Sequence, residues 1–219
     1  GIPAALGTLG AEPFVLASNF ELLIIPLFIF MGNLAGISGM SRDLYAAAYA
    51  WIGHWRGGLA SATIAACAGF AALSGSSVAS AVTMGRVSLP EMKRFNYSSR
   101  LATGCIAAGG TLGILIPPST GFIIYAILTE ESIGRLFLAG MIPGILLASL
   151  FIAAIAIMTR INAKLGPPGP RHSWKQRGKA TGRAMAMILI VVITIGGIYG
   201  GIFTTGEAAG VGAFLAFCL

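Results

Sequence analysis

Long apolar stretches are the feature that most restricts how this chain can fold. The clearest run from Leu101 to Leu128, Leu136 to Thr159 and Ala184 to Phe203, with a shorter one from Leu22 to Met40. Each reaches or approaches the roughly 20 residues that an apolar helix needs to cross the hydrocarbon core of a bilayer. Only 10% of the residues are charged, against about 25% in soluble domains. We therefore expect an all-α integral membrane protein.

The distribution of positive charge predicts how these spans are oriented. Seven of the 14 lysine and arginine residues lie between positions 160 and 183, with no acidic residue among them. Short loops rich in Lys and Arg stay in the cytoplasm, so we expect a basic cytoplasmic loop at 160–183. Glu130 and Glu131 then fall outside, and Lys93 and Arg94 fall inside. Topology accounts for the net charge of +7, and no nucleic acid partner is expected.

The interval from Gly57 to Met92 does not fit an ordinary span. It carries no charge as far as Gly85, and basic residues stand before and after it, at Arg56 and Lys93. One crossing would leave one of these flanks outside, and two crossings need about 40 residues. We predict a re-entrant helical hairpin over 57–92, with its tip at Ser74-Gly75-Ser76-Ser77. The alternative is one long helix with a face of small residues, which would violate the charge rule at one end.

A different kind of segment precedes the hairpin, at residues 41–56. Ser41 is placed to cap a helix start, with Asp43 in the first turn. Trp51 and Trp55 suit the headgroup region of a bilayer, and basic residues stand at both ends of the segment. We predict an interfacial helix that lies along the cytoplasmic surface.

The apolar stretch that ends at Leu128 contains several helix-breaking residues. Gly109-Gly110-Thr111 and Gly113 are followed by Pro117-Pro118-Ser119, near the middle of the stretch. Two consecutive prolines remove two backbone donors and push the preceding residues out of helical geometry. We predict a broken helix over 96–128, interrupted at 109–119, with free carbonyl oxygens near the bilayer midplane. The alternative is a proline kink satisfied by neighbouring helices.

The two predicted breaks carry hydroxyls and free backbone oxygens at matching depth. Discontinuous helices bind cations through unwound carbonyls and helix C-termini, and anionic groups through helix N-termini. No Asp, Glu or His lies inside an apolar span, which argues against a proton relay and against catalysis. We predict a site for Na⁺ as coupling ion, formed by Ser74, Gly75, Ser76, Ser77, Gly110, Thr111, Gly113 and Pro117. Ser76 and Ser119 are candidate substrate contacts.

Several stretches of the sequence resemble one family of membrane proteins. The chain is similar over essentially its whole length to the large membrane subunit of tripartite ATP-independent periplasmic (TRAP) transporters. The matching stretches are Ile25–Leu34 (IPLFIFMGNL), Phe70–Ala81 (FAALSGSSVASA), Ala107–Ser119 (AAGGTLGILIPPS), Gly140–Gly144 (GMIPG) and, more weakly, Gly197–Ala209.

The resemblance implies a permease in the bacterial inner membrane, built from two inverted repeats and working by an elevator mechanism. It implies sodium-driven import of small organic anions such as dicarboxylates, keto acids and sialic acids. The implied partners are a small membrane subunit, a periplasmic substrate-binding protein and the lipid bilayer. Because the chain starts at Gly1 without Met and stops inside an apolar run, we expect a fragment with the first repeat and the start of the second.

These expectations divide the chain into four regions. Residues 1–40 are assigned to a scaffold, 41–56 to an arm, and 57–128 to a transport region. Residues 129–219 are assigned to scaffold helices, the basic loop and the start of the second repeat. Two other functions remain open: a related sodium-coupled dicarboxylate carrier without a binding protein, and a structural membrane subunit that does not transport.

Overall fold

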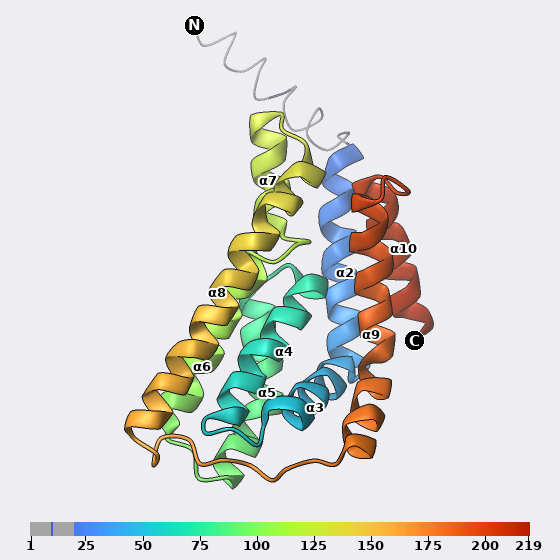
Figure 1. Cartoon of the computed structure of the whole chain (residues 1–219). Coiled ribbons are helices and arrows are strands. Elements are labelled where there is room, and N and C mark those ends of the chain that lie inside the picture. The colour runs from blue at the N-terminus through green and yellow to red at the C-terminus, as the bar shows by residue number, and fades with distance from the viewer. Residues whose placement is uncertain (1–9, 11–19) are drawn as a thin grey trace, which may run out of the picture.

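Helices form all the regular secondary structure in the part of the chain that the computed structural model describes, Gly10 and residues 20–219 (Figure 1). The expected all-α fold class is confirmed. The predicted scaffold region at 1–40 falls partly on residues 1–9 and 11–19, which lie outside the described residues. From η1 onward the elements are η1 (Phe20–Leu23), α2 (Ile24–Ile37), α3 (Met40–Ile52), α4 (Gly58–Ser74), α5 (Ser77–Arg94), α6 (Ser99–Thr111), η2 (Leu112–Ile114), α7 (Thr120–Thr129), α8 (Ile133–Ile161), α9 (Trp174–Tyr199) and α10 (Thr205–Cys218), where η marks a 3-10 helix.

Two of the described helices, α8 and α9, are each long and apolar enough to cross a membrane. Leu138, Ile142, Leu146 and Leu150 remain exposed along α8, as expected where a helix faces lipid. Helices α2 and α3 together are long and apolar enough for a third span, but the chain bends by 67° between them. They form a span only if this bent pair is counted as one.

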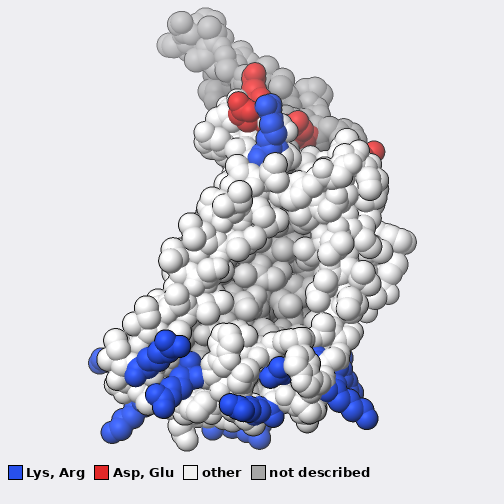
Figure 2. All heavy atoms as spheres, viewed as in Figure 1, with Lys and Arg blue, Asp and Glu red and all other residues white. Residues whose placement is uncertain are grey.

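Charged side chains are separated between the two ends of the molecule. Figure 2 shows lysine and arginine side chains at the lower end, where α8 ends and α9 begins, and acidic side chains mostly at the upper end. The positive-inside rule predicts this separation, and by that rule we expect the lower end to be the cytoplasmic one.

The basic loop is shorter than the sequence indicated. Helix α8 runs to Ile161 and α9 begins at Trp174, so much of the expected loop at 160–183 is helix. Ser173 starts α9 with a capping box. Its hydroxyl accepts from the N–H of Gln176 at 3.3 Å, and the Gln176 side-chain oxygen accepts from the N–H of Ser173 at 2.8 Å. Charge predicts the cytoplasmic side, but it does not distinguish a loop from a helix that extends beyond the membrane.

The hairpin helix α4 lies at the centre of the fold, and 14 of its 17 residues are buried. It packs against α2, α3, α5, α6 and α8. Glycine, alanine and serine make up most of α4, which lets neighbouring helices approach closely. The small-residue face considered as an alternative is therefore present, but the helix ends at Ser74 and the chain turns back, so one long helix is excluded.

The arm helix α3 differs from the prediction at both ends. It begins at Met40 after Gly39, which has a φ of 87° and forms no side-chain cap, while Ser41 is buried inside the helix. It ends at Ile52, so Trp55 follows in a turn. Ser41 does not cap the helix because the bend from α2 requires a positive φ, which glycine adopts without strain.

The described helices pack in two groups. Helix α9 contacts α3 and α10, and α10 contacts α2, whereas α8 packs mainly against α4 and α7. On the α9 side, Trp51 donates from Nε1 to Thr181 Oγ1 at 3.0 Å, and the Arg177 guanidinium lies 5.5 Å from the Trp51 ring centroid. By packing, α8 lies with the hairpin and the broken helix rather than with α9; the assignment of 129–219 to the scaffold stays a prediction. Hydropathy identifies a span but not its neighbours.

The loop between α8 and α9 bonds to two junctions at the cytoplasmic end. The N–H of Gly57 donates to Gly166 O at 2.9 Å, and the N–H of Gly169 donates to Gly53 O at 3.0 Å. The N–H of Ser98 donates to the carbonyl oxygen of residue 165 at 3.0 Å. The loop thus connects the junction between α3 and α4 with the start of α6.

Candidate functional site

The hairpin turns where the sequence placed its tip, between α4 and α5. Gly75 follows α4 with a φ of 57°, and Ser76 precedes α5 in an extended conformation. The Ser76 hydroxyl accepts from the N–H of Ala79 at 3.4 Å and so caps α5. A helix C-terminus and a helix N-terminus meet at the tip, which places free carbonyl oxygens beside free N–H groups. Figure 1 shows this turn about halfway along α8, with α4 and α5 both reaching it from the basic end.

The broken helix is interrupted later than predicted. Helix α6 continues through Gly109, Gly110 and Thr111, and the chain leaves α-helical geometry only at η2. Residues 115–119 are irregular and include a cis peptide bond between Pro117 and Pro118 before α7 begins. The expected break at 109–119 is thus confined to 112–119, because the two glycines remain helical and only the prolines prevent helix continuation.

The hairpin tip and the break are in direct contact. The N–H and the Oγ1 of Thr120 both donate to the carbonyl oxygen of Gly75, at 3.3 and 3.1 Å. Thr120 begins α7, so its N–H is one of the groups that no bond within the helix satisfies. These two bonds hold the hairpin turn against the start of α7.

Glycines permit this close approach of one backbone to another. A Cβ at Gly113 would lie 2.6 Å from the carbonyl oxygen of Ser76, and one at Gly75 would lie 2.6 Å from that of Pro118. A Cβ at Gly110 would lie 3.1 Å from the carbonyl oxygen of Ser77. Several carbonyl oxygens therefore gather in one small region, the arrangement in which discontinuous helices bind cations.

The structure brings most of the predicted sodium-site residues to this contact. Gly75, Ser76 and Ser77 lie on the hairpin side, and Gly110 and Gly113 lie opposite them. Pro117 is buried in the irregular segment next to Pro118. Occupation by sodium stays a prediction.

Three predicted hydroxyls have hydrogen-bond partners within the hairpin or within the broken helix. The Ser74 and Ser80 hydroxyls lie 2.7 Å apart, and the exposed Thr111 donates to Ala108 O at 2.6 Å. Ser119, a predicted substrate contact, is buried and donates to the carbonyl oxygen of residue 114 at 2.9 Å. A hydroxyl that donates one bond keeps lone pairs that can coordinate a cation, so these residues remain candidates.

Sequence reasoning missed four residues that shape the site: Thr120, Ser80, Gly32 and Asn33. A Cβ at Gly32 would lie 2.6 Å from Cα of Ser74, so α2 also touches the tip. The amide of Asn33 was the available signal, because a polar side chain inside an apolar helix is costly and is usually functional.

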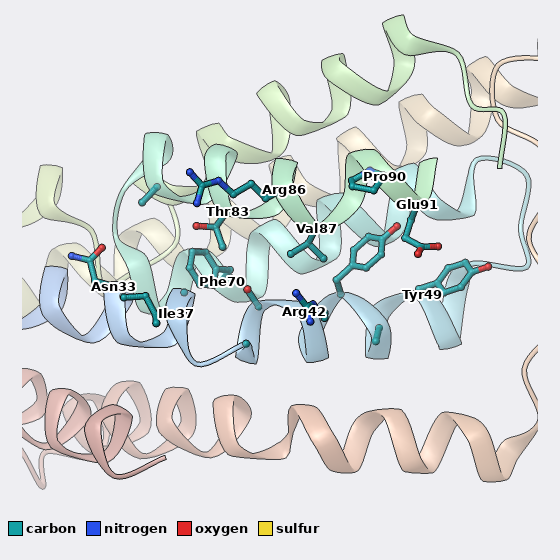
Figure 3. Close-up of a pocket in the computed structure, with 17 residues that line it drawn as sticks. Asn33, Ile37, Arg42, Tyr49, Phe70, Thr83, Arg86, Val87, Pro90 and Glu91 are labelled. Carbon is teal, nitrogen blue, oxygen red and sulfur yellow. The ribbon is translucent and has the colours of Figure 1, made fainter. Parts of the chain in front are cut away.

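Two cavities adjoin the tip. The smaller has a volume of about 360 Å³ and is lined by Ile25, Ile29, Gly32, Asn33, Ser74, Ser76, Ala79, Thr120 and Ile124. The larger, of about 750 Å³, shares Gly32, Asn33 and Ala79 with it and extends between α3 and α5 (Figure 3). Among the described residues, no group of His, Cys, Asp and Glu side chains is placed to hold a metal ion.

Apolar spans, a hairpin that turns about halfway along α8 and a broken helix define a multi-pass membrane protein with discontinuous helices, the class that includes many secondary transporters. The family model of the tripartite ATP-independent periplasmic transporter DctM component matches residues 8–219. The chain belongs to this family, and it is a multi-pass protein of the inner membrane, as the sequence predicted.

Characterised relatives support this assignment. The chain is 45% identical over 201 residues to the C4-dicarboxylate TRAP transporter large permease protein DctM of Vibrio cholerae, covering 92% of this chain and 44% of that protein. It is 41% identical to the corresponding Pseudomonas aeruginosa protein, over 96% of this chain and 49% of that protein. A sialic acid TRAP transporter large permease protein of Vibrio cholerae is 36% identical, over 92% of this chain and 47% of that protein. The chain thus spans about half the length of these relatives.

Proposed function

We propose that this chain forms part of the permease of a sodium-coupled importer of small organic anions that depends on a periplasmic binding protein. Related large permease proteins are named for C4-dicarboxylate, sialic acid and ectoine. Those compounds are small and water-soluble, and each carries at least one carboxylate. A carboxylate-bearing substrate is therefore the class that we assign.

The observation that carries the proposal is the contact between the hairpin tip and the break. Thr120 bonds to Gly75 O, and Gly113 faces the carbonyl oxygen of Ser76, so unwound backbone from two segments converges. Neutral oxygens of this kind suit a monovalent hard cation. Proton-coupled carriers instead use carboxylates or histidines within the membrane, and no Asp, Glu or His is among the described residues that line the smaller cavity at this contact.

Family membership supports the remaining parts of the proposed mechanism. We propose that the chain provides one of two inverted repeats, that the hairpin and the broken helix move as part of an elevator, and that α3 is the arm beside them. A small membrane subunit and a periplasmic binding protein complete the transporter. Family membership favours transport over catalysis.

The proposal is tested with the complete permease, its small subunit and its binding protein in proteoliposomes, with uptake of labelled succinate as the measurement. Ser77→Ala and Thr111→Val should each raise the sodium concentration for half-maximal uptake, because each removes one candidate ligand. Ser88→Ala in α5 and Thr103→Val in α6 are matched controls. Their hydroxyls bond to carbonyl oxygens of their own helices, those of residues 84 and 99, away from the tip.

Four outcomes separate the alternatives. A wild-type sodium response in both tip variants means that these side chains are not ligands. Uptake that follows the proton gradient and ignores sodium contradicts the site. Full sodium-driven uptake without the binding protein favours the related carrier that needs none, and absence of uptake under every condition favours a structural subunit.

A further inference from the structure

Two arginines line the larger cavity and take no part in the tip site. Arg86 lies on α5 and Arg42 on α3, and Figure 3 shows them on opposite walls. Arg86 is nine positions beyond Ser77 in α5, roughly 14 Å along the helix axis. It therefore lies between the tip and the cytoplasmic end.

Neither guanidinium has a partner among the described residues. The two ion pairs that the structure contains there involve Arg94 with Glu91 and Arg135 with Glu131. Glu91 also lines the cavity, at the end where Figure 3 shows Tyr49. Arginine keeps its charge at every physiological pH and offers donors in a planar fork that fits a carboxylate. Two unpaired guanidiniums around one cavity favour an anion in it.

Further polar groups lie toward the tip. Thr83 on α5 and Asn33 on α2 line the same cavity. In Figure 3 the Arg86 side chain extends beside Thr83 toward the end where Asn33 lies. This is the direction expected of a long side chain on a helix, which leans toward the helix N-terminus; in α5 that terminus is the tip.

We propose that Arg86, with Arg42 opposite, forms a carboxylate-binding subsite on the cytoplasmic side of the hairpin tip. It receives the carboxylate of the organic anion after the anion leaves the tip and before it enters the cytoplasm. Thr83 supplies a hydroxyl beside it, and Asn33 borders both cavities and so joins the tip to the subsite. The substrate class rests on the proposed function.

The test compares the effects of removing two different positive charges from the same helix, α5. Arg86→Gln and Lys93→Gln both remove one charge from α5, but Lys93 is exposed and does not line the cavity. Equilibrium binding of succinate to the complete permease is measured in nanodiscs of zwitterionic lipid. We expect Arg86→Gln to weaken binding about ten-fold or more, as for loss of a charge-assisted hydrogen bond. Lys93→Gln should leave binding unchanged, Arg42→Gln should weaken it less, and Arg86→Lys should restore part of it.

Succinate binding by Arg86→Gln at wild-type strength would overturn the subsite. The subsite is also contradicted if Arg86→Gln leaves succinate binding unchanged and reduces only the increase in thermal stability that anionic lipid gives the permease. The guanidinium would then bind a lipid headgroup and not the substrate. A permease that binds succinate through Arg86 but takes none up with sodium contradicts the proposed function and leaves the subsite standing. Thermal unfolding of each variant confirms that it is folded.

Discussion

Gly113 and Gly104 stand close together in the sequence but meet different surroundings. A Cβ at Gly113 would lie 2.6 Å from Ser76 O and 2.9 Å from Ser77 N, whereas a Cβ at Gly104 would meet nothing within 4 Å. The neighbouring atoms at Gly113 are backbone and cannot turn aside as a flexible side chain would. The absence of a side chain at Gly113 is therefore required for the hairpin tip to pack against the break in the helix.

We expect Gly113→Ala to lower the free energy of unfolding by about 1–3 kcal/mol through overpacking. It should also raise the sodium concentration for half-maximal uptake, since the two breaks are forced apart. Denaturant unfolding of the detergent-solubilised permease and sodium titration of uptake measure these effects. Gly104→Ala should be neutral or stabilising by up to about 1 kcal/mol, because alanine favours an exposed helix position. Equal losses in both variants would show that contact with the tip is not the cause.

Residue types predicted where the backbone breaks, but not where each hydroxyl bonds. Glycine at 75 permits a positive φ, and the prolines at 117 and 118 fix φ and remove backbone donors, so the sequence alone indicates a break. Ser74 bonds to Ser80, and Thr120 bonds to Gly75 across 45 positions. Such pairings depend on how segments pack, which no local pattern contains.

The hairpin is the element that the charge pattern predicted best. Basic flanks and an uncharged interval too short for two spans required a turn, and α4 and α5 meet at Gly75 and Ser76. Helix ends were predicted less well, because the capping box at Ser173 and the bend at Gly39 depend on local geometry. The hairpin's position relative to the bilayer stays a prediction.

Cysteine labelling of intact cells tests this topology. Arg56→Cys and Lys93→Cys, each in a background without the native cysteines, should both be shielded from a membrane-impermeant maleimide added outside and react after permeabilisation. We expect this because both positions lie at the basic end of the molecule, where the hairpin begins and where it ends. Glu131→Cys, at the acidic end, should react without permeabilisation and serves as the control. Labelling of positions 56 and 93 from opposite faces would contradict the hairpin.

At the scale of the whole molecule, polar side chains beside the larger cavity and the tip are exposed. Arg86 of α5 and Thr111 at the end of α6 are both exposed, although Arg86 lines the larger cavity and Thr111 is next to Gly110, which faces Ser77. Carriers with inverted repeats place their site at the interface between the repeats, and the chain spans about half the length of its relatives.

Residues 1–219 alone should therefore show no sodium-dependent uptake of succinate in proteoliposomes. The complete permease, reconstituted at the same density with its partners, is the positive control. Circular dichroism of the reconstituted chain verifies that it is helical, so that absence of uptake does not merely reflect misfolding. Measurable sodium-dependent uptake by the chain alone would contradict a site shared between two repeats.

The loop between α8 and α9 limits how far the two groups of helices can separate. It comprises residues 162–173, which when fully extended reach about 40 Å. While Gly169 remains bonded to Gly53, only residues 170–173 are free to extend toward α9, and they reach roughly 14 Å. A larger separation of the start of α9 from Gly53 must break that backbone bond. The loop can thus span a short distance while the hydrogen bond between Gly169 and Gly53 is intact, and a longer distance once that bond is broken.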